Sequence, residues 1–418
     1  MKKSYIILLI GIISIKGYSQ SATTPPIEKE WDVSIYGFVR TDYILDTRKT
    51  VQVREENLNL YPLDEVLDAN GKDINKTVQS NFLSVTSRLG VKAKGPNVWG
   101  AKTSAVLEGD FFGNLEGSTI GLFRLRHSYV NLEWSKTTLT MGQTWYPQYI
   151  PEVFPGVANF NTGILFNPFG WATQVKLKQM LSKELSLTFV AYKEREFTTP
   201  GPGTQNSASI NSALPTIHGQ IQYKGKNVLM GLGSEYKSLQ PLTVSNALAT
   251  SEKAISSSIF GFAKYSNDKI AIKAYGISGG NLYNLVMLGG YTGKTITGGV
   301  ETYDPIKTTA FWFDVSSNAK SIAPGIFFGY TKNNGSSDDS ATATYINYMR
   351  GVSGTRVVDK IWRGSTRVDF KKNKFRISPE LEYTVATWGD LIKNNATAST
   401  NKKDVNNFRA MVSCVYSF

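Results

Sequence analysis

The final eleven residues constrain the fold of this chain more than any other segment. Between Phe408 and Phe418, apolar and aromatic side chains occupy the even positions, while most odd positions carry smaller or more polar side chains. Strict alternation of this kind predicts a β-strand whose two faces lie in different media. The apolar face consists of Phe408, Ala410, Val412, Cys414, Tyr416 and Phe418.

The sequence closes on an aromatic residue, and a second aromatic residue stands two positions earlier. This ending resembles the terminal strand that the assembly machinery of the bacterial outer membrane recognises. A half-buried strand of a soluble sandwich also alternates, but it would not often place Phe at the last position. We therefore expect an outer-membrane β-barrel whose last strand binds that machinery.

The first residues predict a cleaved secretory signal. Lys2 and Lys3 precede an apolar run from Tyr5 to Ile15, and small residues follow at Gly17 and Ser19. The run is too short to span a membrane as a helix, so a membrane anchor is the weaker alternative. No cysteine lies near the cleavage point, which argues against a lipoprotein.

The domain organisation follows from the two ends. We expect a signal peptide over residues 1–19, a short periplasmic segment over 20–30 and a single all-β domain over 31–418. That domain should be a transmembrane antiparallel barrel, since no later stretch has the ~20 apolar residues of a spanning helix.

Composition excludes several classes of function. The single cysteine, Cys414, rules out a disulfide framework and a cysteine-based metal site. The formal charge of +13 falls to about +10 without the signal peptide. A basic excess suits nucleic acid, anionic lipid or an anionic solute, and export makes nucleic acid the poorest of these.

Alternating segments of about ten residues recur along the chain, and polar-in, apolar-out strands of this length are typical of a water-filled membrane barrel. Sixteen are predicted, although fourteen or eighteen stay open, and short turns alternate with long polar loops between them. The strands are expected near 31–45, 80–94, 98–112, 122–134, 137–145, 172–181, 184–197, 216–224, 227–238, 254–265, 268–282, 308–316, 321–331, 356–370, 374–386 and 404–418.

Charged residues fall on the faces predicted to point inward. An Arg or Lys facing lipid at mid-depth costs about 2–4 kcal/mol, so these side chains should line the lumen. Arg and Lys rings favour anions, but the same residues could instead pair as internal salt bridges, as Arg40 with Asp42 or Arg376 with Glu380. The predicted pore-lining set is Arg40, Arg88, Arg124, Arg126, Arg363, Arg367, Arg376 and Arg409, with the acids Asp42, Glu108, Asp110, Glu380 and Glu382.

The segment from Trp145 to Trp171 has four prolines, eight aromatic residues and one charge. Proline blocks ladder pairing, so the segment is not another pair of strands. Its apolar character requires burial, and we expect it to fold into the lumen as a constriction loop; a contact with a neighbouring subunit is the alternative. Its candidate polar and constriction residues are Gln143, Trp145, Gln148, Glu152, Asn159, Asn161 and Asn167.

Residues 123–145, FRLRHSYVNLEWSKTTLTMGQTW, resemble the DcaP-like outer-membrane porins, which carry an R-x-R-H-x-Y strand followed by G-Q-T-W. The stretches 36–48 and 100–113 fit the same pattern. The resemblance implies a trimeric porin with a basic pore that favours small carboxylates. It also implies that Arg124 and Arg126 project toward the pore and that Gln143 lies where the constriction loop leaves the wall. One departure is the missing heptad pattern between Gln20 and Trp31.

Enzymatic interpretations find little support. The alternation that turns Arg126 inward should turn His127 outward, with Ser128 on the opposite face, so this serine and histidine do not share the face that a Ser-His site needs. Asp338 and Asp339 lie in a Ser-rich loop and are best explained as solvated. We expect no catalytic residue, no metal and no cofactor.

Together these observations predict a passive outer-membrane channel for small polar or anionic solutes. Its expected partners are outer-membrane lipids, the assembly machinery and two further copies of the chain in a homotrimer. The alternative from another class is a plugged barrel that acts as a surface adhesin or as a component of a secretion or uptake complex.

Overall fold

The computed structural model describes residues 31–53, 58–113, 121–337 and 343–418. The predicted signal peptide (1–19), the segment 20–30 and the Asp338-Asp339 pair lie outside the described residues. No helix in the described ranges has the length and apolarity to cross a membrane.

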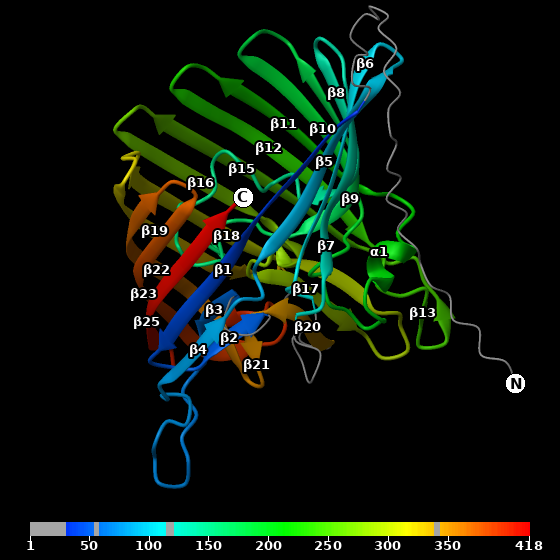
Figure 1. Ribbon diagram of the computed structural model, residues 1–418. Helices are drawn as coiled ribbons and strands as arrows, with labels where there is room; N and C mark the ends of the chain where they lie inside the picture. Colours follow the sequence, from blue (N-terminus) through cyan, green and yellow to red (C-terminus); the bar gives the residue numbers. More distant parts are fainter. Residues whose placement is uncertain (1–30, 54–57, 114–120, 338–342) are drawn as a thin grey trace, which may run out of the picture.

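The described residues form a closed barrel of sixteen antiparallel strands (Figure 1). Alternation of the kind noted at the C-terminus gives each strand one face for the lumen and one for the exterior. The strands are β1 (Asp32–Asp46), β5 (Arg88–Val98), β6 (Ala101–Asp110), β7 (Arg124–Glu133), β8 (Thr137–Trp145), β9 (Trp171–Met180), β10 (Leu185–Tyr192), β11 (Thr216–Lys224), β12 (Val228–Leu239), β15 (Ala254–Ser266), β16 (Ile270–Gly280), β18 (Thr302–Ser317), β19 (Ile322–Gly335), β22 (Arg356–Lys372), β23 (Phe375–Ile392) and β25 (Lys403–Ser417).

The barrel closes between its first and last strands. Strand β1 pairs with β25 from Phe38↔Ser417 to Asp46↔Arg409, and on its other side it pairs with β5. Each remaining barrel strand pairs with its neighbours in chain order. Both the predicted count of sixteen and the antiparallel order are therefore confirmed.

In the described ranges, nine shorter strands and two short helices accompany the barrel strands, with one of these strands in the wall and the others in the connections. They are β2 (Thr50–Val53), β3 (Leu58–Pro62), β4 (Gln79–Leu83), β13 (Val244–Ser245), β14 (Leu248–Ala249), β17 (Gly289–Thr295), β20 (Thr344–Arg350), β21 (Val352–Ser353), β24 (Thr397–Ala398), α1 (Ser207–Asn211) and the 3₁₀ helix η2 (Tyr283–Leu285). β17 pairs with both β18 and β20, so the sheet continues beyond the barrel wall at the long-loop end.

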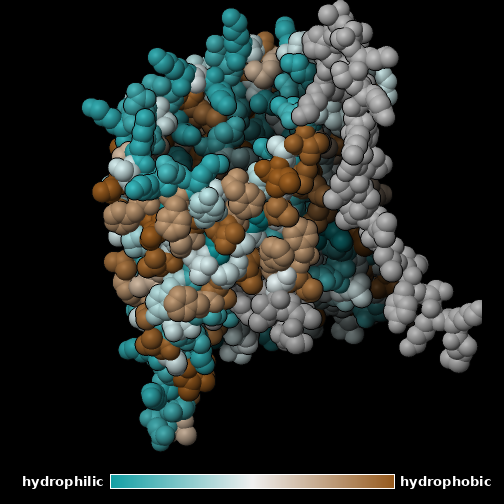
Figure 2. Space-filling view, in the orientation of Figure 1, coloured by the Kyte–Doolittle hydropathy of each residue, from teal (hydrophilic) through white to brown (hydrophobic). Residues whose placement is uncertain are grey.

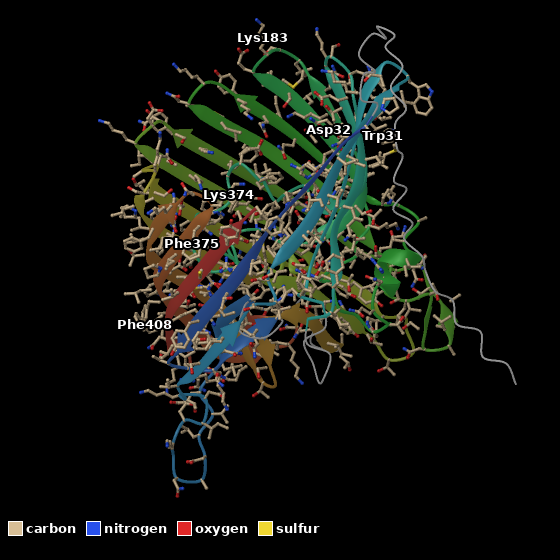
Figure 3. The ribbon with its side chains drawn as sticks, viewed as in Figure 1. Trp31, Asp32, Lys183, Lys374, Phe375 and Phe408 are labelled. Atoms are coloured by element: carbon tan, nitrogen blue, oxygen red, sulfur yellow. The ribbon has the colours of Figure 1, made fainter. Side chains whose placement is uncertain are left out.

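The outer wall is apolar and the rims are polar. Apolar side chains on the exterior, such as Ile35 and Leu232, are more than 60% exposed, while their inward neighbours are largely covered. Figure 2 shows the resulting brown band below a hydrophilic upper rim. Phe375 at the turn end of β23 and Phe408 near the loop end of β25 lie toward the two limits of the wall (Figure 3). This is the surface that a lipid bilayer requires.

The second barrel strand differs from the prediction of one segment over 80–94. It is broken into β4 and β5, which pair with the two halves of β1. At the break, the Ser87 hydroxyl accepts a hydrogen bond from the Arg40 backbone N–H at 3.0 Å. A side-chain oxygen thus takes the place of a backbone carbonyl as the acceptor at this point of the ladder. The alternation of apolar residues does not show such a replacement, so the sequence pattern could not predict the break.

Candidate functional site

The segment between β8 and β9 folds into the barrel, as predicted. Most of its side chains are buried, including Tyr146, Ile164, Leu165 and Phe166, each with no exposed surface. Side-chain oxygens of two asparagines shape it locally, because Asn159 accepts from the N–H of Asn161 at 3.2 Å and Asn161 accepts from the N–H of Gly163 at 3.1 Å. We call residues 146–170 the inward segment.

Hydrogen bonds fasten the inward segment to strands on several sides of the lumen. Its Ala158 accepts from Arg40 Nη2 of β1 at 2.7 Å and donates from its N–H to Glu380 Oε2 of β23 at 2.6 Å. Asn167 accepts from Trp312 Nε1 of β18 at 3.1 Å, and the Gln148 amide donates to the Glu235 carboxylate of β12. The segment therefore reaches across the lumen.

Two further segments enter the lumen, although the sequence pattern predicts polar loops at their positions. Leu58, Leu60 and Tyr61 of β3 are at most 2% exposed, and residues 282–288 around η2 are almost all buried. Both pack into one apolar cluster with the inward segment. The runs Leu58–Tyr61 and Leu282–Leu288 are themselves rich in apolar residues, and this signal within a polar loop could have indicated burial.

Arg363 of β22 joins two of these segments. Its Nη1 donates to the Ile164 carbonyl at 3.0 Å and its Nη2 donates to the Leu60 carbonyl at 2.8 Å. The same side chain donates to Thr384 Oγ1 at 2.8 Å and lies 3.4 Å from the Glu382 carboxylate. With 1% of its surface exposed, Arg363 serves as an internal anchor rather than a free charge in the pore.

A stack of aromatic rings marks the point where the inward segment leaves the wall. Trp145 and Trp171 are directly paired in β8 and β9, and their ring centroids lie 4.4 Å apart. The Arg126 guanidinium lies 4.4 Å from the Trp171 centroid, and Tyr149 stacks on Trp145 at 4.1 Å. Cation–π and stacking contacts fix the direction in which the segment enters the lumen.

A β-bulge in β7 overturns the predicted outward direction of His127. The register of β6 and β7 shifts between Glu108 and Gly109: His127 pairs with Glu108, and Leu125 pairs with Gly109. Arg126 is therefore the extra residue of the bulge, and both Arg126 and its neighbour His127 are buried. His127 Nε2 lies 3.8 Å from Glu108 Oε1 inside the barrel. A bulge places two adjacent side chains on the same face, which breaks the alternation on which the prediction rested.

Gln143 stabilises this bulge. It belongs to β8, and its Nε2 donates to the carbonyls of Leu125 at 3.0 Å and Arg126 at 3.3 Å. The β7–β8 ladder ends at Ser128↔Gln143, so these two carbonyls lie beyond the paired part of the strands. The side chain thus supplies the donors that the ladder lacks there, just before the wall gives way to the inward segment.

The predicted charged residues meet in pairs on the inner wall. Arg40 pairs with Asp42 at 2.7 Å, as the salt-bridge alternative expected, and Arg409 pairs with Asp46 at 2.7 Å. The expected pair of Arg376 with Glu380 does not form, because Glu380 accepts backbone N–H groups of the inward segment. Further pairs are Arg88–Glu108, Arg124–Asp110, Arg124–Glu196, Arg126–Glu108, Arg126–Asp110, Arg363–Glu382 and Arg367–Asp314.

The polar residues of the inward segment divide into two groups. Asn159 and Asn161 donate to Asn59 of β3 at 3.1 and 2.9 Å, so they link the buried segments to each other. Glu152 is different, since its side chain is 45% exposed and lies 3.9 Å from Lys224. Of these residues, only Glu152 combines a charge with substantial exposure.

A basic cavity opens between the inward segment and the short-turn end of the barrel. It has a volume of about 650 Å³ and reaches the turn that contains Asn373 and Lys374. We call it the vestibule. In the part of the chain that the structure describes, Asp369 is the single acid in its lining. Its charged lining residues are Arg40, Arg88, Arg126, Lys273, Arg367, Asp369, Lys371, Lys374 and Arg376.

Two vestibule cations lack a close carboxylate among the described residues. Other cations of the vestibule do have a carboxylate nearby, since Lys371 lies 4.0 Å from Asp369 and Arg367 lies 3.2 Å from Asp314. Arg376 and Lys374 lie within 4.0 Å of no carboxylate among the residues that the structure describes. Their positive field therefore acts on the cavity with the least local compensation.

A second cavity of about 490 Å³ also borders Trp145 of the aromatic stack. Its lining includes the charged or titratable residues Lys92, Glu108, His127 and Lys176.

In the described ranges, His, Cys, Asp and Glu side chains form no group of three that could hold a metal ion.

Comparison with protein-family models gives no match, and comparison with curated proteins gives none. Solved structures do match. The outer-membrane channel DcaP of Acinetobacter baumannii is 16% identical with a TM-score of 0.66, over 94% of this chain and 98% of that one. The chain has the porin fold.

Two further solved structures agree with this assignment. An anion-selective porin from Comamonas acidovorans is 14% identical with a TM-score of 0.55, over 93% of this chain and 100% of its own. OmpT, an outer-membrane protein of Vibrio cholerae, is 12% identical with a TM-score of 0.54, over 93% and 98% of the two chains. The resemblance predicted from residues 123–145 is thus confirmed for the fold.

Proposed function

We propose that this chain is an outer-membrane porin through which small anionic or polar solutes, including carboxylates, diffuse passively. The inward segment narrows the lumen, and the charged inner wall selects by size and field without turnover. Under this proposal the short turns face the periplasm, residues 1–19 are removed on export, and the last strand is recognised by the assembly machinery.

The vestibule is the observation that supports anion preference. Most arginines of the inner wall are neutralised by acidic partners, as Arg40 is by Asp42. The total number of cations therefore overstates the positive electrostatic field in the lumen. Arg376 and Lys374 lack such partners among the described residues and line the same 650 Å³ cavity. An anion entering this cavity meets a net positive potential.

Reversal potentials in planar bilayers test the proposal. Purified protein should give stepwise conductance and, under a KCl gradient, a reversal potential of the anion-selective sign. Arg376→Gln combined with Lys374→Gln should move this potential toward zero. Lys332→Gln is the matched control, because Lys332 is an exposed cation on the outer face of β19 and should leave the potential unchanged.

Two results would overturn the proposal. A cation-selective reversal potential in the unmodified protein would contradict anion preference. An equal shift in the double variant and in Lys332→Gln would remove the vestibule from the selectivity mechanism.

A homotrimer is also part of the proposal, by analogy with porins of this fold. Native mass spectrometry in mild detergent measures the oligomeric state directly. A monomer at all protein concentrations would contradict a trimer without affecting the passive channel.

The apolar cluster inside the barrel favours one second candidate, a plugged barrel that serves as an adhesin or as part of a secretion or uptake complex. The inward segment, β3 and the residues around η2 share this cluster within the lumen. Correctly folded protein that inserts into bilayers without conducting would favour this candidate over the porin.

A further inference from the structure

The outer wall contains a groove formed by paired small residues. In the ladder between β15 and β16, Gly261 is directly opposite Gly276 and Ala263 is directly opposite Ala274. Directly opposite residues of an antiparallel pair lie on the same face of the sheet. Two adjacent rows of the wall therefore carry almost no side chain over the width of two strands.

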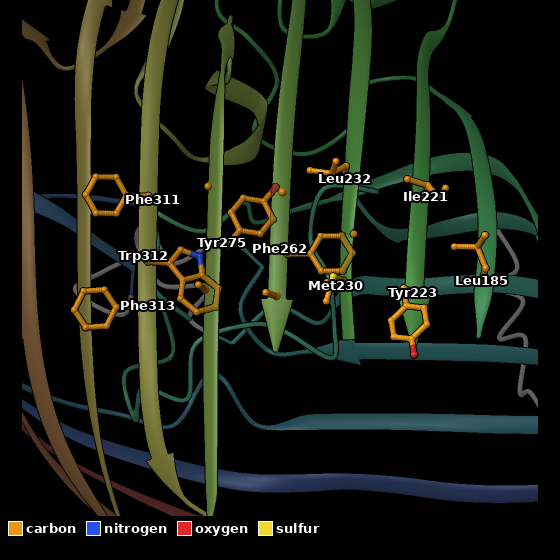
Figure 4. Close-up of a pocket in the computed structure, with 15 residues that line it drawn as sticks. Leu185, Ile221, Tyr223, Met230, Leu232, Phe262, Tyr275, Phe311, Trp312 and Phe313 are labelled. Atoms are coloured by element: carbon orange, nitrogen blue, oxygen red, sulfur yellow. The ribbon is translucent and has the colours of Figure 1, made fainter. Parts of the chain in front are cut away.

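Larger side chains stand on both sides of these rows. Leu232 of β12 pairs with Gly261 and Met230 pairs with Ala263, while Phe311 and Phe313 of β18 pair with Gly276 and Ala274. The exposed fractions of these four apolar side chains range from 42% to 62%. Figure 4 shows Phe311 and Phe313 at one side of the groove and Met230 and Leu232 toward the other.

The groove has the dimensions and chemistry of a hydrocarbon site. Its volume is about 740 Å³ and its lining is almost wholly apolar. With strands ~4.8 Å apart, a floor two strands wide accommodates one or two methylene chains. A flat barrel wall would offer lipid only a continuous layer of side chains, whereas this groove encloses a chain on three sides.

Basic side chains lie beyond the turn end of the groove. Ala263 is three residues from Ser266, the last residue of β15, so the groove floor ends ~10 Å from the short turns. Lys183, Lys226, Lys269 and Lys320 are exposed on four successive turns of this rim, against the two exposed acids Glu184 and Asp268. Tyr265, two residues beyond Ala263 on β15, stands between the groove floor and the rim, where amphipathic rings meet lipid headgroups, and Tyr223 lines the groove level with Ala263.

We propose that the groove binds an acyl chain of an anionic phospholipid, whose phosphate headgroup lies against the lysines of these turns. The apolar floor would bind the acyl chain of the lipid, and the lysines of the rim would attract its negatively charged headgroup. A second copy of the barrel is the weaker occupant, because its ridged wall would leave the two glycine and alanine rows unfilled. The inference depends on the porin fold but not on which solute the lumen conducts.

The test uses the full-length protein with two lipids that share acyl chains and differ in headgroup charge. Native mass spectrometry should retain at least one phosphatidylglycerol per barrel, with at least fivefold weaker retention of phosphatidylethanolamine. Gly276→Leu fills the groove, and a Cβ there meets only Ala310 O and Phe311 Cβ at 3.8 Å. We expect this variant to lose most of the retained phosphatidylglycerol.

Gly364→Leu is the matched control. Gly364 pairs with the outward Phe328, so it lies on the outer wall, and a Cβ there meets nothing within 4 Å. It should bind phosphatidylglycerol as the unmodified protein does. Lys226→Gln with Lys269→Gln should reduce the preference for phosphatidylglycerol over phosphatidylethanolamine.

Equal lipid retention in Gly276→Leu and Gly364→Leu would overturn the proposal. So would a change of oligomeric state in Gly276→Leu with unchanged retention, which would assign the groove to a second copy. Heat-dependent gel mobility verifies folding, and Ala274→Leu provides a second filling variant. Failure here would leave bilayer conductance and its ion selectivity intact, so it is distinguishable from failure of the proposed function.

Discussion

The Ile164 carbonyl of the inward segment accepts a hydrogen bond from Arg363 Nη1 of β22 at 3.0 Å, deep inside the barrel. Replacing this arginine with methionine should leave several acceptors and the Glu382 carboxylate without their donor. Removal of one partner of a buried ion pair costs about 3–5 kcal/mol, so Arg363→Met should lower the urea midpoint of unfolding. It should also increase single-channel conductance, because the inward segment and β3 lose a shared anchor.

Arg195→Met is the control for this change. Arg195 lies in a connection beyond β10 and is exposed, so its loss should affect neither quantity. If Arg363→Met unfolds at the same urea concentration as the unmodified protein, Arg363 is not an anchor.

Glu380 holds the inward segment from another side. Its carboxylate accepts the N–H of Ala158 at 2.6 Å and of Asn159 at 3.3 Å. Glu380→Ala leaves both donors buried and unsatisfied, which should destabilise the barrel by about 1–3 kcal/mol. Glu380→Gln retains an acceptor oxygen and should cost less. Current noise in bilayers and the denaturation midpoint measure the two effects, and equal values for both variants would contradict this account.

Gln143 should matter for the bulge rather than for permeation. Gln143→Ala removes two hydrogen bonds to the carbonyls of Leu125 and Arg126, and we expect a loss of about 1 kcal/mol. Ion selectivity should stay the same, since the side chain bonds to the wall itself. A changed reversal potential with unchanged stability would show that Gln143 acts in the pore.

Arg124 and Arg126 are expected to act together with their acidic partners. Each pairs with Asp110, at 2.7 and 3.1 Å respectively. Arg124→Ala with Arg126→Ala should therefore expose negative charge and shift the reversal potential toward cations. Adding Asp110→Asn should partly reverse this shift. A shift that is the same with and without Asp110→Asn would contradict compensation by this carboxylate.

The loop between β3 and β4 should respond to acid. Partial burial raises the pKa of Asp73, but the Asn75 N–H and the Arg48 guanidinium outweigh it and hold this pKa below the ordinary value. Because the folded pKa is the lower one, the carboxylate stabilises the loop fully above ~pH 4, and this contribution is lost as pH falls through the folded pKa.

Hydrogen exchange of the Val66 and Asn75 amides measures this effect, since both donate to Asp73 Oδ1. Their protection, corrected for intrinsic rates, should fall as the pH drops below ~4 and passes through the folded pKa of Asp73. In Arg48→Gln the pKa of Asp73 should rise, so protection should fall at a higher pH. Loss of protection at the same pH in the unmodified protein and in Arg48→Gln would refute the prediction.

The barrel strands were predictable because their physical cause is repeated in each of them. A wall between lipid and water imposes alternation on every strand, and β8 and β11 have the predicted bounds. The bulge at Arg126 and His127 was not predictable, because one extra residue in a ladder leaves no mark in the composition of the strand. The break between β4 and β5 depends on the Ser87 hydroxyl and was hidden for the same reason.

The interior was only partly predictable. Apolar and proline-rich residues identified the inward segment, since an exposed loop of that composition would be unstable in water. The charges were assigned to the inner wall, but sequence could not show which ones are neutralised. Arg363 and Arg376 look alike in the sequence, yet one lies 3.4 Å from Glu382 and the other lies in the vestibule without a close carboxylate among the described residues.

The inward segment is bonded to Arg40 of β1 and to Glu235 of β12, and seven barrel strands separate β1 from β12 in either direction. It is therefore a strut along a full diameter. Any flattening of the barrel under lateral pressure must stretch or compress that diameter and so strain hydrogen bonds at both ends. The shape of the wall and the width of the passage are mechanically coupled, and a tightly packed membrane cannot deform one while the other stays as it is.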